Sequence, residues 1–162
     1  MNKELRDLAG RTPPVAFALA TLLVMFFLRV MGQFVVALDY RSFLPPMEQW
    51  QSGLLPYSVL LGCQLLIITL FGKICIDIAT QQGFFAVKRP MAGAFLIKFS
   101  YVYYLAMVVR YCVQMYLYPD DRWFGHTIPI VFHFVLATFL LLLGRYNCAT
   151  GLKNLYRKYR QP

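Results

Sequence analysis

The chain has 162 residues, of which 59% are hydrophobic, 17% are aromatic and 14% are charged, and its formal net charge is +9. Soluble domains average about 45–50% apolar and about 25% charged residues, and a core of this size cannot hide so much apolar surface from water. This composition excludes a disordered chain, a nucleic-acid-binding module and an ordinary soluble enzyme, and it predicts a protein surrounded mostly by lipid.

Four apolar windows are each long enough to cross a membrane, and they cover residues 14–38, 54–79, 93–117 and 127–149. A hydrocarbon core about 30 Å thick needs roughly 20 helical residues. Only helices and closed barrels satisfy their backbone in lipid, and these runs lack the alternation of a barrel strand. The predicted fold is therefore an all-α integral membrane protein with four transmembrane helices in an up-down-up-down bundle, forming a single domain over residues 1–162.

A signal peptide is the alternative interpretation of the first window, because basic residues precede it and Val35 and Ala37 near its end could form a small-residue cleavage site. The window is longer than the usual apolar region of about 7–15 residues, and Arg29 interrupts it. We therefore expect the first window to be a retained span.

The basic residues of the short connections indicate the orientation of the chain. The opposite side carries Arg41 and Arg122 alone. Both termini are therefore predicted to be cytoplasmic, with membrane lipids rather than nucleic acid as the partner of the positive charge. The basic residues assigned to the cytoplasmic side are Lys3, Arg6, Arg11, Lys88, Arg89, Lys153, Arg157, Lys158 and Arg160.

The predicted outer face is acidic and aromatic. Its tryptophans, Trp50 and Trp123, fit an interfacial aromatic belt. Carboxylates and an imidazole could also bind a divalent metal, but their spacing matches no metal-binding motif, so we expect no metal site. The residues that such a site would use are Glu48, Asp120, Asp121 and His126.

Polar residues inside the four windows are the most informative feature of the sequence. In the first and third windows an arginine precedes a glutamine by one helical turn, so each pair shares a face. At the helical rise, Arg29 and Gln64 lie about 13 and 15 Å from the outer ends of the first and second windows. Arg110 and His133 lie about 10 and 9 Å from the outer ends of the third and fourth. The candidate ligand-binding residues are Arg29, Gln33, Gln64, Arg110, Gln114 and His133.

This layer predicts a cationic pocket in the outer half of the bundle. Intramembrane charges are costly and normally face the bundle interior or a watery cavity, and arginine does not lose its proton. The predicted guest carries a carboxylate, a phosphate or a carbonyl-bearing ring such as a quinone. Alternatively, the arginines snorkel outward or bond to carbonyls of a partner protein. The walls predicted for the pocket are Cys63, Tyr103, Met107 and Tyr111.

Other features of the windows favour structural roles. Lys73 and Asp77 are four residues apart and are expected to pair, and Ser58 and Gly62 form a small-xxx-small step that permits close helix approach. Residues 152–159 are predicted to form a short helix at the membrane surface.

The cysteines and histidines give no cofactor signature. The four cysteines form no C-x-x-C motif and are expected to be free. A haem held by two histidines from facing helices is excluded because His133 lies in the last window and His126 directly precedes it, which leaves only a haem with His133 as its sole axial ligand.

Two short stretches, Arg29-Val30-x-Gly32 and Leu141–Arg145, resemble DoxX-type four-helix membrane proteins, as does the layout of four spans. The first connection departs from the short one expected in that family. The resemblance implies a role in quinone-linked or redox-associated membrane complexes, and it assigns no functional residues.

The sequence therefore predicts a small multi-pass accessory or scaffold subunit. The absence of a catalytic motif favours a binding protein over an enzyme. Its pocket would bind a lipid-like or anionic ligand or a partner helix, within a larger membrane complex or through self-association. A quinone-interacting membrane redox protein is one alternative. A small organic-anion transporter acting as an oligomer is another.

Overall fold

The computed structural model describes residues 13–38, 50, 56–117 and 127–159, without the side chains of residues 127 and 149–159. Four helices run through these residues. They are α2 (Pro14–Leu38), α4 (Tyr57–Thr80), α5 (Pro90–Leu117) and α6 (Thr127–Tyr159). Each contains a stretch long and apolar enough to cross a membrane. The chain is a small all-α, multi-pass membrane protein, as predicted.

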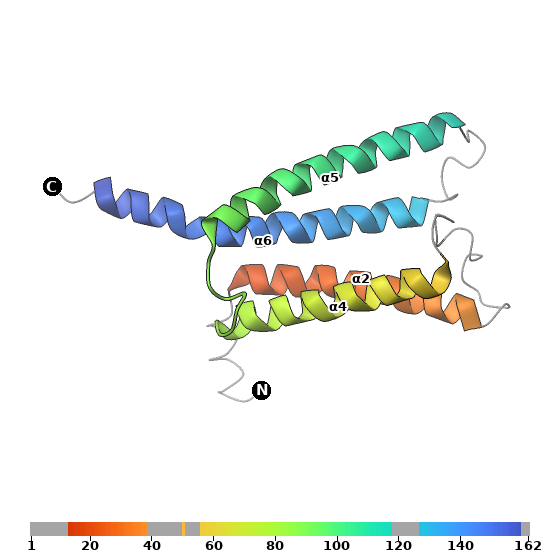
Figure 1. The fold of residues 1–162 in the computed structure, drawn as a ribbon, viewed down its shortest axis with the longest axis horizontal. Helices are drawn as coiled ribbons and strands as arrows, with labels where there is room; N and C mark the ends of the chain where they lie inside the picture. Colours follow the sequence, from red (N-terminus) through yellow and green to blue (C-terminus); the bar gives the residue numbers. More distant parts are fainter. Residues whose placement is uncertain (1–12, 39–49, 51–55, 118–126, 160–162) are drawn as a thin grey trace.

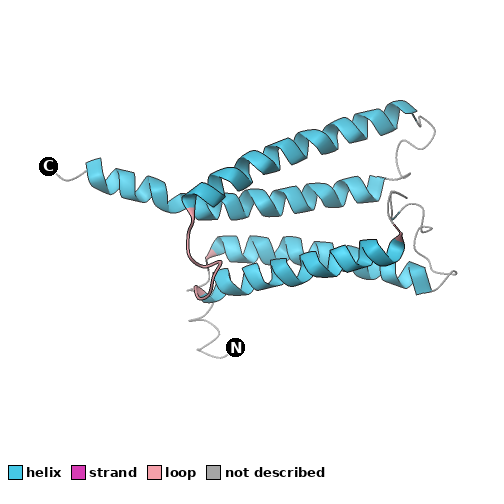
Figure 2. Ribbon diagram, viewed as in Figure 1, coloured by secondary structure: helices cyan, strands magenta, loops and turns pink. Residues whose placement is uncertain are grey.

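The helices alternate in direction along the bundle (Figure 1). Among the described residues, the helix backbones approach closely in three pairs, α2 with α4, α2 with α6 and α5 with α6. Side chains of α4 also reach α6, whereas α4 and α5 do not pack against each other. The connection between α4 and α5 is the one that the structure describes in full (Figure 2). Helices α2, α4 and α6 therefore form a group of three, to which α5 is attached through α6.

Prolines fix several helix starts. Pro14 opens α2, where the missing N–H costs nothing. Pro56 precedes α4 with φ −55° and ψ 143°, so α4 begins at Tyr57 and not at residue 54 as predicted. Pro90 opens α5 three residues before the predicted start. The apolar windows misplaced these ends because they follow hydropathy and not backbone geometry.

Helix α6 continues well beyond its apolar part. The stretch that can span a membrane is Ile128–Cys148, whereas the helix reaches Tyr159. The predicted helix over residues 152–159 is thus helical, but it is continuous with the span. It projects past the ends of the other helices (Figure 1).

The hydrophobic core occupies the half of the bundle near the α4–α5 connection. Its centre is a stacked ring pair, Phe71 and Phe139, with centroids 3.8 Å apart and planes 9° from parallel. Leu19 and Ile78 are fully buried beside it. These residues join α2, α4 and α6 at this end of the molecule.

Asp77 organises the α4–α5 connection. Its carboxylate is 2% exposed, pairs with Lys73 Nζ at 2.6 Å and accepts the Phe85 N–H at 3.2 Å. Gly83 passes so close, with φ +94°, that a Cβ there would lie 2.6 Å from the carboxylate. The predicted Lys73–Asp77 pair is confirmed, and it holds the turn as well as the helix.

Glycines bring α5 and α6 together at the same end. A Cβ on Gly93 would lie 2.8 Å from the Gly144 carbonyl oxygen, and one on Gly144 would lie 3.0 Å from that of Gly93. Such close backbone approach is the usual function of small residues between membrane helices. Next to the Gly93–Gly144 contact, the Arg89 N–H donates to Asn147 Oδ1 at 3.0 Å.

The small-residue step predicted to mediate helix packing does not do so within the described part of the chain. Ser58 and Gly62 are exposed, and nothing lies within 4 Å of a Cβ placed on Gly62. Helix α5 is also largely unpacked, with Gly93 and Ser100 its buried residues. It diverges from α6 toward Leu117 (Figure 1). In a membrane protein these surfaces face lipid or other helices.

Candidate functional site

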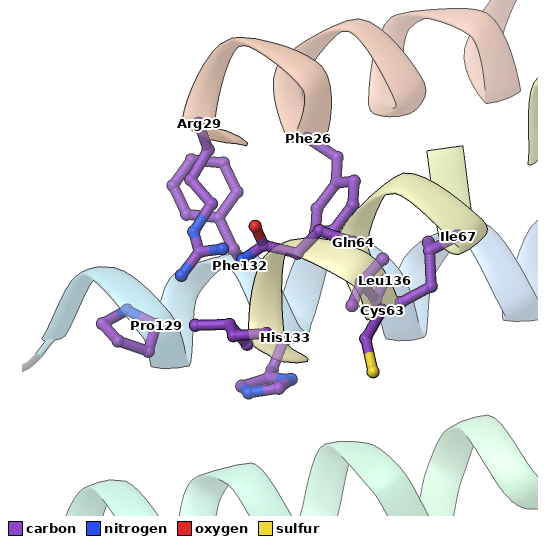
Figure 3. Close-up of a pocket in the computed structure, with 10 residues that line it drawn as sticks. Phe26, Arg29, Cys63, Gln64, Ile67, Pro129, Phe132, His133 and Leu136 are labelled. Carbon is purple, nitrogen blue, oxygen red and sulfur yellow. The ribbon is translucent and has the colours of Figure 1, made fainter. Parts of the chain in front are cut away.

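A cavity of about 120 Å³ lies between α2, α4 and α6 (Figure 3). Its lining residues belong to the half of the bundle away from the α4–α5 connection. Arg29, Gln64 and His133 contribute its charged and polar groups, one from each helix. The remaining lining is apolar apart from one thiol. It consists of Phe26, Leu60, Cys63, Ile67, Pro129, Phe132 and Leu136.

Among the residues that the structure describes, Arg29 is the one permanently charged side chain that lines the cavity, and it is 8% exposed. Its Nη2 donates to the Trp50 carbonyl oxygen at 2.7 Å, and its guanidinium carbon lies 5.7 Å from the Phe132 ring centroid. Its Nε is buried and has no hydrogen-bond partner among the described residues. Asp77, the one carboxylate in the described residues, is on α4 about 20 Å further along from Gln64. The guanidinium charge is therefore not neutralised by any described residue.

Two buried glutamines lie beside Arg29. Gln64 Nε2 donates to Gln33 Oε1 at 3.0 Å, and the two side chains are 3% and 0% exposed. The other amide atoms, Gln33 Nε2 and Gln64 Oε1, are buried with no partner in the described part of the chain. A buried polar atom without a hydrogen bond costs about 1–3 kcal/mol, so a polar guest that pairs with these atoms would be stabilised.

His133 connects the cavity to α5. Its Nδ1 lies 2.6 Å from the Tyr103 hydroxyl, and the two rings meet edge to face with centroids 5.8 Å apart. Because Tyr103 engages one ring nitrogen, the other is the nitrogen that remains for a ligand or water. The imidazole points from α6 toward α5 (Figure 3).

The structure gathers four of the six predicted binding residues. Arg29, Gln64 and His133 line one cavity, and Gln33 is bonded to Gln64. With α4 starting at Tyr57, Gln64 is seven residues, about 10 Å, from that helix end, close to the depth of His133 in α6. Their role in binding stays a prediction.

The two residues predicted from the third window do not line the cavity. Arg110 and Gln114 are half-buried on α5, which packs against α6 alone among the described helices. For the same reason the predicted walls Tyr103, Met107 and Tyr111 are absent from the lining, whereas Cys63 is present. The arginines of the first and third windows lie at similar depth, but only Arg29 reaches this cavity.

Some predictions fall on residues outside the described ones. These include the metal-binding alternative, which uses Glu48, Asp120, Asp121 and His126. Among the residues that the structure describes, no group of three His, Cys, Asp or Glu side chains could hold a metal ion. The four cysteines are free, as predicted.

Sequence reasoning missed Trp50 as a partner of the site. It was assigned to an interfacial belt, but its side chain is 8% exposed and its carbonyl bonds to Arg29. The apolar lining was also missed, including Phe26 and Phe132. A buried arginine needs hydrogen-bond acceptors, so the sequence could have predicted a carbonyl partner for Arg29. It could not have identified Trp50 as the residue that supplies this carbonyl.

No protein-family model, curated protein sequence or solved structure matches this chain. The resemblance to DoxX-type proteins therefore stays a prediction. The function is argued below from the atoms of the cavity.

Proposed function

We propose that this membrane protein is a non-catalytic accessory subunit whose cavity binds the anionic head of a lipid-like amphiphile. The observation that carries the proposal is the buried charge of Arg29, which has one carbonyl partner and no carboxylate among the described residues. Burying an ion costs several kcal/mol unless an opposite charge and hydrogen bonds offset the cost. A phosphate or carboxylate head bound in the cavity supplies both.

The hydrogen-bonding groups beside the cavity suit such a head. Arg29 lines the cavity, and its Nε is a buried donor without a partner in the described residues. Gln33 Nε2, on the glutamine bonded to Gln64, is a second such donor next to the lining. Phosphates and ionised carboxylates are strong acceptors, and hydrogen bonds between charged groups are about twice as strong as neutral ones. His133 adds a further polar side chain to the lining of the same cavity.

The size and walls of the cavity favour a head with a chain attached. A volume of about 120 Å³ is smaller than the roughly 300–1,000 Å³ of pockets that enclose drug-sized ligands. The lining from α4 includes exposed Cys63, and α4 does not pack on α5 among the described residues. An alkyl chain can therefore leave the cavity sideways into lipid while its head stays at Arg29.

The orientation of the protein then assigns the leaflet. Under the positive-inside rule, the distribution of basic residues favours a cytoplasmic position for both termini. With that orientation the cavity lies in the outer half of the membrane. The proposed ligand is thus an anionic amphiphile of the outer leaflet.

The test is equilibrium binding of an alkyl phosphate and of the alcohol of equal chain length to the purified protein. We expect the phosphate to bind more tightly, and Arg29→Gln to weaken its binding by about 10- to 100-fold, as expected for a lost charged hydrogen bond. Lys98→Gln is the control, because Lys98 is an exposed cation on α5 that does not line the cavity, and it should change binding little. Equal affinities for the phosphate and the alcohol would contradict the proposal.

The other hypotheses lead to different results in related experiments. A quinone extracted from the purified protein, or a quinone that binds as tightly as the phosphate, would favour the redox alternative. Uptake of a small organic anion into proteoliposomes that Arg29→Gln abolishes would favour transport. Co-purification with a stable membrane partner in mild detergent would support the accessory role.

A further inference from the structure

Trp50 contacts the α2 helix at two points one turn apart. The edge of its ring lies on Gly32, where a Cβ would be 2.8 Å from Cη2 and 3.2 Å from Cζ3. Its carbonyl oxygen accepts the hydrogen bond from Arg29 Nη2. Residues three apart share a helix face, so one residue from the connection between α2 and α4 engages this face through both its ring and its backbone.

From this geometry we propose that Trp50 is a positioning residue for Arg29. Its ring, seated on Gly32, fixes the carbonyl oxygen that keeps the guanidinium inside the bundle. We call this arrangement the Trp50 clamp, made of Trp50, Gly32 and Arg29. The inference rests on the proposed function, because it concerns how the anion-binding group is held.

The clamp matters because the Arg29 side chain could otherwise leave the bundle interior. A long cationic side chain within a membrane helix tends to extend toward the interface, where water and headgroups solvate it. Holding Nη2 on a carbonyl prevents that movement and leaves Nε, which has no partner in the described residues, for a ligand. Fixing the side chain beforehand reduces the ordering cost of binding.

The identity of residue 32 follows from the same contact. Glycine within a helix costs about 0.5–1 kcal/mol relative to alanine, so its presence in α2 needs a reason. At Gly32 the ring occupies the volume of a Cβ, and any other side chain would displace it. Gly62 in α4 has open space instead, which makes it a matched control.

The test is a double-mutant cycle on alkyl phosphate binding. We expect Gly32→Ala to weaken binding about tenfold, because the new methyl group displaces the Trp50 ring and with it the carbonyl. In a Trp50→Ala background the same substitution should have no further effect, since no ring remains to be displaced. Gly62→Ala should leave the affinity unchanged.

Two further measurements separate positioning from general damage to the fold. Affinity for the alcohol of equal chain length should not change in Gly32→Ala, because the clamp acts through the arginine charge. Trp50→Phe should recover part of the affinity lost in Trp50→Ala, because a smaller ring can still rest on Gly32. A loss of alcohol binding equal to the loss of phosphate binding would overturn the clamp.

The outcomes also separate this inference from the function on which it rests. Absence of Arg29-dependent phosphate binding in the wild-type protein would overturn both. Arg29-dependent binding together with independent, multiplicative effects of Gly32→Ala and Trp50→Ala would overturn the clamp and leave the proposed function standing. Non-additive effects confined to the phosphate would support both.

Discussion

The two halves of this bundle use the same apolar composition in different ways. Near the α4–α5 connection, Gly93 and Gly144 bring two backbones together, and Asp77 has its hydrogen bonds made by a lysine and a backbone N–H. In the other half a cavity separates three helices, and Arg29 and Gln64 keep buried atoms without a partner among the described residues.

This contrast separates stability from binding. Sites that bind ligands often carry unsatisfied or strained groups that a purely stable structure would not keep. The packed half holds the stacked Phe71–Phe139 pair and the buried side chains around it. It can therefore support the cost of a cationic cavity next to it. Added side-chain volume should therefore destabilise the packed half and stabilise the half that holds the cavity.

The largest loss of stability is expected at the α5–α6 contact. Gly144→Leu would force a side chain against the Gly93 carbonyl oxygen and the Ile97 backbone nitrogen, which lie 3.0 and 3.1 Å from an ideal Cβ. We expect a destabilisation of about 3 kcal/mol, at the upper end for overpacking, measured by unfolding in one detergent. Gly62→Leu, in open space, is the control, and equal stability of the two variants would refute the assignment.

The turn after α4 gives the next largest effect. Gly83 has φ +94°, which side-chain-bearing residues rarely adopt. We expect Gly83→Ala to destabilise the protein by about 2 kcal/mol, from backbone strain and the clash with the neighbouring carboxylate. The same unfolding measurement applies. Gln82→Ala, next to it and exposed, should be nearly neutral.

One substitution made in both halves tests the comparison directly. Leu136→Phe adds volume at the cavity, so it should stabilise the protein by about 1 kcal/mol and weaken alkyl phosphate binding. Leu143→Phe, two turns further along α6 in the packed core, should destabilise it by about 1.5 kcal/mol and leave binding unchanged. Effects of the same sign on stability would show that the halves do not differ in packing.

The smallest effect is expected at the contact between Tyr103 of α5 and His133, which lines the cavity. Tyr103→Phe removes the hydroxyl bonded to His133 and should cost about 0.5 to 1 kcal/mol, the net value of one hydrogen bond. Tyr101→Phe, on the exposed side of α5, is the control. If Tyr103→Phe also weakens phosphate binding, the orientation of the imidazole contributes to the site.

The sequence predicted the number of helices and most of their extent because a lipid environment demands long apolar segments. The start of α2 at Pro14 matched, since a proline and an apolar run coincide there. The end of α6 did not match, because a helix can continue after its apolar pattern stops. Hydropathy shows which residues are surrounded by lipid, whereas the residues at which a helix begins and ends depend on caps and backbone geometry.

The depth of the site residues in the membrane was predictable from the sequence, but the direction in which each helix face points was not. Helical rise puts Arg29, Gln64 and His133 at similar levels, and the structure brings them to one cavity. Which side of α5 faces the bundle could not be derived, because that helix is apolar nearly all round. The glycines that decide its packing, Gly93 and Gly144, were not singled out, whereas exposed Gly62 was.

Helix α6 has a practical consequence for work on this protein. At the helical rise its 33 residues measure about 50 Å, roughly 20 Å more than the hydrocarbon thickness of a bilayer. A small rigid protein joined to Tyr159 through an uninterrupted helix would inherit the direction of α6. Such a fusion would give a protein of this size the external landmark that particle alignment in electron cryomicroscopy requires.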